Sequence, residues 1–165
     1  MPSPSTPARI LRDPAERVSP RAPLMWFLGA LIGGLVLLGA ALAVQLLWLD
    51  WPWWAYALLV VVVAGYVVVM PQWRYRVHRW EVTDTAVYTQ TGWWTRERRI
   101  APMSRIQTVD YSQGALSRIF GLASVTVTTA SAAGALEIAG LEAGRAQALA
   151  EDLTHKAHVV PGDAT

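Results

Sequence analysis

Two long charge-free apolar runs constrain this chain more than any other feature. Residues 24–49 contain no ionisable group, and Gln45 is their only strongly polar side chain. A helix of that length rises about 39 Å, enough to cross the hydrocarbon core of a bilayer, which is roughly 30 Å thick. Residues 51–70 form a second charge-free run, separated from the first by Asp50 alone. The sequence therefore predicts a hairpin of two transmembrane helices within residues 24–71.

Two features of the first run leave alternatives open. Ala41-Leu42-Ala43 resembles a signal-peptidase site, so the run can also be read as a cleaved signal peptide. The long tail before it and the second run directly behind it favour a retained span. Gly29 and Gly33 form a G-x-x-x-G pattern, which can pack the hairpin against itself or provide a face for dimerisation. We favour packing within the hairpin.

Arginines gather on both outer flanks of the predicted hairpin, whereas its turn contains Asp50 and no basic residue. Short segments rich in Lys and Arg stay on the cytoplasmic side of a membrane. We therefore expect two passes through the plasma (inner) membrane, with the N- and C-termini cytoplasmic. Four tryptophans crowd the turn, as expected for rings anchored at a membrane–water interface: Trp48, Trp51, Trp53 and Trp54.

The segments around the hairpin differ in composition. Residues 1–23 hold six prolines and show no helical or strand period, so we expect a disordered cytoplasmic tail, and residues 160–165 look the same. Residues 72–159 contain short runs bounded by turn residues, the first at residues 74–82, which is typical of antiparallel strands. Residues 141–158 carry an apolar stripe at helical spacing. About seven strands closed by this C-terminal helix predict an all-β or α+β barrel or a sandwich.

A long ordered motif runs through this β-rich part. It consists of Arg99-Ile100-Ala101-Pro102, then Arg105-Ile106-Gln107-Thr108-Val109, then Arg118-Ile119-Phe120-Gly121-Leu122, and it ends at Thr129-Ala130. In this order the segments resemble the bacterial pleckstrin-homology-like (PH-like) domain family in which the domain follows a two-helix membrane hairpin. The resemblance covers roughly residues 24–158. It implies a PH-like barrel with a closing C-terminal helix and a membrane location, and it implies little about activity.

The basic residues after the hairpin are the clearest functional lead. Cationic side chains beside a span are attracted to anionic lipid by about 1 kcal/mol each, and tryptophan adds interfacial insertion. Six arginines and one tryptophan form this predicted lipid-facing cluster: Arg74, Arg76, Arg79, Arg96, Arg98, Arg99 and Trp73. The alternative is that these arginines only fix the topology and orient the domain on its own bilayer.

Residues 113–118 are the candidate partner loop, with Gln113, Leu116 and Arg118 as its contact residues. A structural interpretation of the same motif is also open. In that interpretation the apolar residues fill the core, Gly121 permits a backbone bend, and Arg118 ties loops together.

The sequence predicts neither catalysis nor a cofactor. It contains no cysteine, no glycine-rich phosphate loop and no G-x-S-x-G nucleophile motif. His155 and His158 lie at i, i+3 spacing near Asp152, but without a fourth ligand or a pocket signal we predict no metal site. The part of the chain beyond Arg99 is net acidic, which argues against nucleic-acid binding. No small-molecule substrate is evident.

These observations lead us to expect a non-catalytic, membrane-anchored binding module that engages another membrane protein at the cytoplasmic face. Two alternatives stay open. The chain can self-assemble as a structural membrane protein, for which the G-x-x-x-G pattern provides helix contacts, or it can sense anionic lipid through the juxtamembrane arginines.

Overall fold

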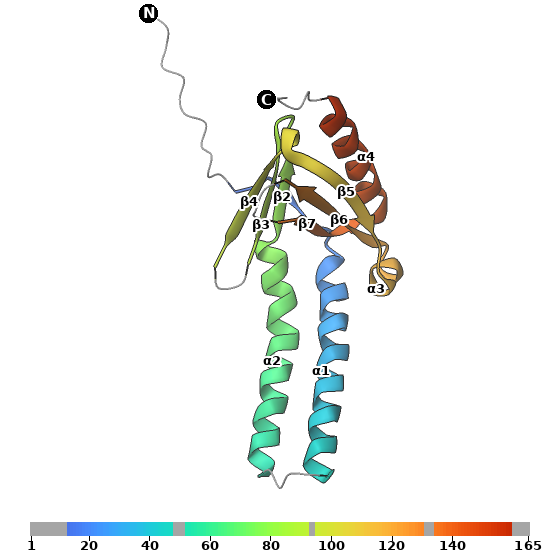
Figure 1. The fold of residues 1–165 in the computed structure, drawn as a ribbon. Coiled ribbons are helices and arrows are strands. Elements are labelled where there is room, and N and C mark those ends of the chain that lie inside the picture. Colours follow the sequence, from blue (N-terminus) through green and yellow to red (C-terminus); the bar gives the residue numbers. More distant parts are fainter. Residues whose placement is uncertain (1–12, 48–51, 93–94, 131–133, 160–165) are drawn as a thin grey trace, which may run out of the picture.

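The computed structural model describes residues 13–47, 52–92, 95–130 and 134–159. Two long helices, α1 (Ala22–Leu47) and α2 (Trp53–Val77), lie side by side and carry a β-rich domain on one end (Figure 1). Both helices are long and apolar enough to cross a membrane, as the sequence predicts. The predicted turn at Asp50, with Trp48 and Trp51, lies outside the described residues.

The apolar side chains of the hairpin point outward. Leu46 is 76% exposed and Val36 is 67% exposed, which in water would be a large apolar surface. In a bilayer the same surface faces hydrocarbon, so its exposure carries no such cost. The arrangement therefore fits a hairpin whose solvent is lipid.

Helices α1 and α2 pack tightly against each other at Gly34 of α1. A Cβ atom added there would lie 2.8 Å from Val63 Cγ1 of α2. The predicted role of the G-x-x-x-G pattern in packing the hairpin is wrong. An atom added at Gly29 faces Leu116 at 3.7 Å, and one added at Gly33 meets nothing within 4 Å.

The described strands form two antiparallel sheets, with order β1-β2-β3-β4 in the first and β5-β6-β7 in the second. The first contains β1 (Glu16–Arg17), β2 (Arg79–Val82), β3 (Ala86–Thr91) and β4 (Glu97–Pro102). The second contains β5 (Ile106–Ser112), β6 (Leu122–Thr129) and β7 (Leu136–Glu142). The short helices η1 (Met103–Arg105) and α3 (Ala115–Ile119) interrupt the strands, and α4 (Ala143–Val159) follows them.

The predicted barrel does not close among the described residues. Strands β4 and β5 follow one another in the chain but belong to different sheets. Pro102 ends β4 because proline cannot donate a backbone hydrogen bond to a strand ladder, and η1 then redirects the chain. The two sheets and the helix therefore resemble the sandwich alternative more than a closed barrel.

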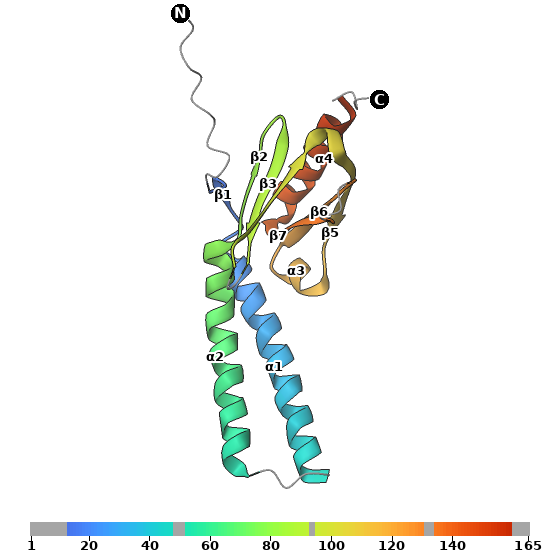
Figure 2. The same cartoon turned by 60° about the vertical axis from the view of Figure 1, so that its left-hand side comes forward.

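The core lies between the two sheets and α4, which packs against β5, β6 and β7 of the second sheet (Figure 2). Helix α4 buries Ala146, Leu149 and Leu153, which lie on one helical stripe. The sheets contribute alternating residues such as Leu122 and Ile138, neither of which has exposed surface. The predicted amphipathic C-terminal helix is confirmed.

The segment before the hairpin is part of the folded domain. Glu16 pairs with Trp80 and Arg17 with Arg79, so this segment adds a short edge strand to the first sheet. Val18 follows and is only 3% exposed. The predicted disorder is therefore wrong for residues 13–23, because a single apolar residue at a sheet edge leaves no periodic signal. Residues 1–12 and 160–165, also predicted to be disordered, lie outside the described residues.

Helix α2 runs further than predicted, through the buried Pro71 to Val77. The predicted strand at residues 74–82 is therefore wrong in its first half, since β2 begins at Arg79. The reason is a contact with α1 that the local pattern does not reveal. The Arg74 guanidinium stacks on the Trp26 ring, 4.2 Å from its centroid, which favours the helical position of Arg74.

Candidate functional site

The candidate site is the junction where the hairpin meets the sheets, and a glycine makes the junction possible. Gly140 of β7 has φ of +79°, and a Cβ atom there would lie 2.9 Å from Ala22 Cβ and 3.2 Å from Trp26 Cζ2. Only glycine combines that backbone conformation with so close a neighbour. The Ser19 amide also donates to the Gly140 carbonyl at 2.9 Å. The start of α1 is thereby fixed against β7.

A chain of polar contacts ties the end of α2 to the first sheet. The buried Gln90 amide donates to the Val77 carbonyl at 3.3 Å, and Gln90 Oε1 accepts from Arg98 Nε at 3.0 Å. Arg98 also pairs with Asp13. Together the contacts link α2, β3, β4 and the segment before α1, so the sheets are fixed to the hairpin at both helices.

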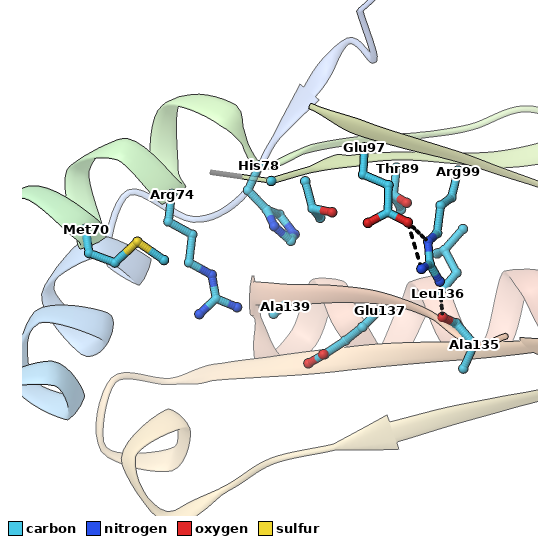
Figure 3. A pocket seen from close by; sticks show the side chains of 12 residues that line it. Met70, Arg74, His78, Thr89, Glu97, Arg99, Ala135, Leu136, Glu137 and Ala139 are labelled. Atoms are coloured by element: carbon cyan, nitrogen blue, oxygen red, sulfur yellow. Dashed lines mark hydrogen bonds and ion pairs between the residues drawn. The ribbon is translucent and has the colours of Figure 1, made fainter. Parts of the chain in front are cut away.

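A cavity of about 400 Å³ lies between the end of α2, strands β3 and β4, and strand β7 (Figure 3). We call it the junction cleft. The cleft carries both signs of charge, from Arg74 and Arg99 on one hand and from Glu97 and Glu137 on the other. Arg99 Nη2 lies 2.7 Å from Glu97 Oε1, and Arg99 Nη1 donates to the Ala135 carbonyl at 3.1 Å. Arg99 is thus held across the two sheets.

His78 caps α2 and lines the junction cleft with its ring (Figure 3). The residue is only 4% exposed, and its Nε2 atom is buried with no hydrogen-bond partner in the part of the chain that the structure describes. Burial, and to a smaller extent the positive charge of Arg74, lower the pKa of His78 from 6.5 to about 4. At neutral pH the ring is therefore uncharged, and it holds an unused polar atom beside the cleft.

Arg74 lies between the junction cleft and a second cavity of about 380 Å³. We call the second cavity the helix groove, because it lies between α1 and α2 and is covered on one side by α3. Its walls are mostly apolar or aromatic: Met25, Trp26, Gly29, Ala30, Tyr66, Met70, Pro71 and Leu116. Met70 and Arg74 line both cavities, so the helix groove and the junction cleft adjoin at these two side chains.

The structure divides the predicted lipid-facing cluster. Arg74 and Arg99 line the junction cleft, while Arg98 contacts Gln90 and Asp13 within the domain. The other members lie on the surface or partly so: Trp73 and Arg76 of α2, Arg79 of β2, and Arg96 before β4. The cluster is therefore not a single patch, and only Arg74 and Arg99 face a common cavity.

The predicted partner loop lies beside the hairpin. Gln113 Nε2 donates to the Leu122 carbonyl at 2.9 Å, and Leu116 lines the helix groove against Gly29. Ser117 Oγ lies 3.4 Å from Met25 Sδ. Arg118 is exposed, and the neighbouring Ile119 is 75% exposed. The loop thus docks on α1 through one face and leaves Arg118 and Ile119 on the other.

Sequence reasoning missed His78 and Glu137 as members of the site. His78 is visible in the sequence only as one more polar residue in a basic stretch, and Glu137 as an isolated acid in a short strand. Their proximity depends on how β7 crosses the end of α2. No local signal reports that crossing.

A third cavity, open and about 740 Å³ in volume, lies on the far side of the domain between β5 and α4. Its lining residues are Tyr111, Gln147, Ala150, Glu151, Thr154 and His155. We call it the β5–α4 groove. Strand β5 is an edge of its sheet, and most of its residues are exposed. The groove therefore combines a strand edge with an adjacent helix face.

Comparisons with known proteins agree with the resemblance read from the sequence. The family model described as "Bacterial PH domain" matches residues 24–157. The UPF0699 transmembrane protein YdbS of Bacillus subtilis (strain 168) is 33% identical over 157 residues, which cover 92% of this chain and 98% of the relative. No solved structure gives a significant match. The chain therefore belongs to the bacterial PH domain family, as a two-pass membrane protein whose apolar hairpin precedes every described strand except β1.

Proposed function

We propose that this protein is a non-catalytic binding module, anchored at the cytoplasmic face of the plasma membrane, that engages an extended segment of another membrane protein. The orientation is supported by charge. Arg17, Arg21, Arg74 and Arg76 flank the end of the hairpin that carries the sheets, while Trp53 and Trp54 are exposed at the opposite end. Basic flanks stay cytoplasmic, and tryptophan anchors either interface.

The β5–α4 groove is the observation that supports an extended protein segment as the partner. An edge strand offers unpaired backbone groups, to which an extended peptide can add as a further strand. Side chains of such a peptide would enter the groove, where Tyr111 is 43% exposed and Ala150 provides an apolar floor. Glu151 at the groove favours a basic side chain in the partner. The β5–α4 groove shares no lining residue with the helix groove, and none of its lining residues belongs to α1 or α2.

The non-catalytic part of the proposal is supported by the family. A PH-like fold does not carry an activity with it, so an activity would need its own constellation of groups. Among the described residues no group of three or more His, Cys, Asp or Glu side chains could hold a metal ion.

A photocrosslinking amino acid at Thr154, which lines the β5–α4 groove, tests the proposal in the full-length protein in its native membrane. The matched control is the same probe at Ala148, exposed on α4 but outside the groove. We expect one reproducible membrane-protein adduct from position 154 and none from position 148. The crosslinked peptide should map to an extended segment of the partner.

Other outcomes decide against the proposal. Capture of a second copy of the chain at position 154 would support the self-assembly alternative. Equal capture from positions 148 and 154 would mean that the groove is not the binding surface.

A further inference from the structure

The polar junction cleft and the mostly apolar helix groove adjoin at Met70 and Arg74. We propose that this site binds a single phospholipid with an amine-bearing headgroup, its phosphate between Arg74 and His78 and one acyl chain in the helix groove. This site is distinct from the β5–α4 groove, and its occupant is a lipid rather than a protein.

The depth of the site matches a membrane lipid. From Trp53 to Arg74, helix α2 rises about 32 Å, close to the hydrocarbon thickness of a bilayer. With Trp53 at one interface, Arg74 lies at the level of the headgroups of the opposite leaflet. The helix groove, with Gly29 and Tyr66, then lies one to two turns deeper, at the level of the acyl chains. A lipid of that leaflet can thus reach both cavities without leaving its own layer.

The polar end of the site has the donors that a phosphate requires. The Arg74 guanidinium is a fixed cation, because it stacks on Trp26 while lining both cavities. His78 holds a buried Nε2 atom with no partner among the described residues. An unpaired buried polar atom costs free energy unless a ligand or water satisfies it. A rotation of the His78 ring that turns Nε2 toward the cleft would let the neutral ring, with its proton on Nε2, donate to a phosphate oxygen, whose negative charge then lies beside the Arg74 cation.

The carboxylates of the junction cleft determine which headgroup fits. Glu137 on β7 lines the cleft opposite Arg74 (Figure 3), and Glu97 is already paired with Arg99. The site therefore offers one positive and one negative group to a ligand. Glu137 already attracts Arg74 across the cleft. A phosphate joined to a primary amine matches both charges, whereas a headgroup without an amine brings a negative charge near Glu137 and no positive group to face it. Phosphatidylethanolamine has that chemistry and phosphatidylglycerol lacks it.

The glycine of the helix groove gives the acyl chain its space. Gly29 lines the groove and faces Leu116 of α3, where an added Cβ would lie 3.7 Å from Leu116 Cδ1, so a large side chain at position 29 would fill the groove. Gly33, one turn further along α1, has nothing within 4 Å of an added Cβ and does not line the groove. The two glycines form a matched pair for testing whether the groove is occupied.

Native mass spectrometry of the full-length protein in detergent tests the proposal. The protein is delipidated and then incubated with an equimolar mixture of phosphatidylethanolamine and phosphatidylglycerol. We expect one retained phosphatidylethanolamine on the wild type and about a tenfold lower bound fraction on Arg74→Gln, since a charge-assisted contact is lost. Arg76→Gln makes the same charge change two residues away, outside both cavities, and should retain the lipid. Gly29→Leu should lose it and Gly33→Leu should keep it.

Four other results would overturn the proposal or part of it. An equal loss on Arg76→Gln and Arg74→Gln would assign lipid retention to general surface charge and overturn the site. Retention on Gly29→Leu would remove the acyl chain from the groove, as would full competition by soluble glycerophosphoethanolamine. Preferential retention of phosphatidylglycerol would overturn the headgroup assignment. If Arg74→Gln does not elute as a folded species, His78→Gln provides the same comparison from the other side of the phosphate.

Discussion

In helix α1, Leu46 is 76% exposed, whereas in strand β6 Leu122 has no exposed surface at all. The hairpin and the sheets are both rich in aliphatic residues, but they place them on opposite sides because they face different solvents. In lipid the outer surface of a helix needs no burial, so helix pairing depends on close packing at small residues such as Gly34. In the sheets the same residue types are driven inward by water.

At the junction, the chain passes within a few residues from helices that face lipid to sheets that face water. Gly140 admits α1 against β7, Gln90 secures the end of α2, and Arg74 places a charge where the two helices leave the hydrocarbon. The comparison teaches that polar and strained features concentrate at this boundary, and the candidate lipid site lies at the same place.

The largest effect is expected from one substitution made in both regions. Leu122→Ala should lower the free energy of unfolding by about 2–5 kcal/mol, because it leaves a cavity in the core. Leu46→Ala should change it by about 0.5 kcal/mol or less, because Leu46 faces outward. Denaturant unfolding in detergent, followed by circular dichroism, measures both. Similar losses for the two variants would contradict the division between the regions.

Gly140→Ala should cost about 3 kcal/mol, because it combines a left-handed backbone with a Cβ atom 2.9 Å from Ala22 Cβ. Gly134→Ala is the matched control, since Gly134 has φ of +77° and nothing within 4 Å of an added Cβ. Gly134→Ala should lose only the free energy that the left-handed backbone costs alanine, about 1 kcal/mol. The same unfolding measurement applies. Equal losses would mean that the contact between α1 and β7 does not stabilise the junction.

His78 makes stability depend on pH at the junction. Its pKa is about 4 in the folded protein and 6.5 as a reference, so above pH 6.5 the ring is neutral in both states. As the pH falls through this window the unfolded chain takes up a proton that the folded protein does not, and stability falls. Between pH 7 and pH 5 the loss should be about 2 kcal/mol.

The control for that prediction is His78→Gln, and the quantity to compare is the pH slope of the unfolding free energy in the two proteins. Groups that line the cavity with His78 are Arg74 of its own helix, Glu97 and Arg99 of β4, and Glu137 of β7. Because these groups are common to both proteins, the difference between the two pH slopes gives the contribution of the His78 ring alone. An unchanged slope in His78→Gln would contradict the assignment.

The smallest effect is expected inside the hairpin. Gly34→Ala should lower the unfolding free energy by about 1 kcal/mol, because the new methyl group meets Val63 Cγ1 at 2.8 Å. Gly33→Ala meets nothing and should be neutral or slightly stabilising, since alanine favours a helix. Thermal unfolding of the two variants side by side in one detergent measures the difference. A greater loss for Gly33→Ala would place the helix contact on the predicted G-x-x-x-G face instead.

The sequence predicted the elements whose signal is local and strong. The hairpin follows from two charge-free runs, and helix α4 follows from the stripe that includes Ala146 and Leu153. The family follows from an ordered motif. Errors occurred where a distant contact decides. Val18 is buried because β1 pairs with β2, more than sixty residues away in the chain, and Arg74 is helical beside Trp26 although its surroundings alternate like a strand.

The sequence by itself thus determined that two spans exist and that β structure and a helix follow, because apolar length and period are properties of neighbouring residues. Only the tertiary structure decided how the parts meet. Strand β7 crosses the end of α2 and brings Glu137, His78 and Arg74 around one cleft, although they are as much as 63 positions apart in the chain. Such a site depends on the packing of α1 against Gly140, which is a property of the folded chain and of no single segment.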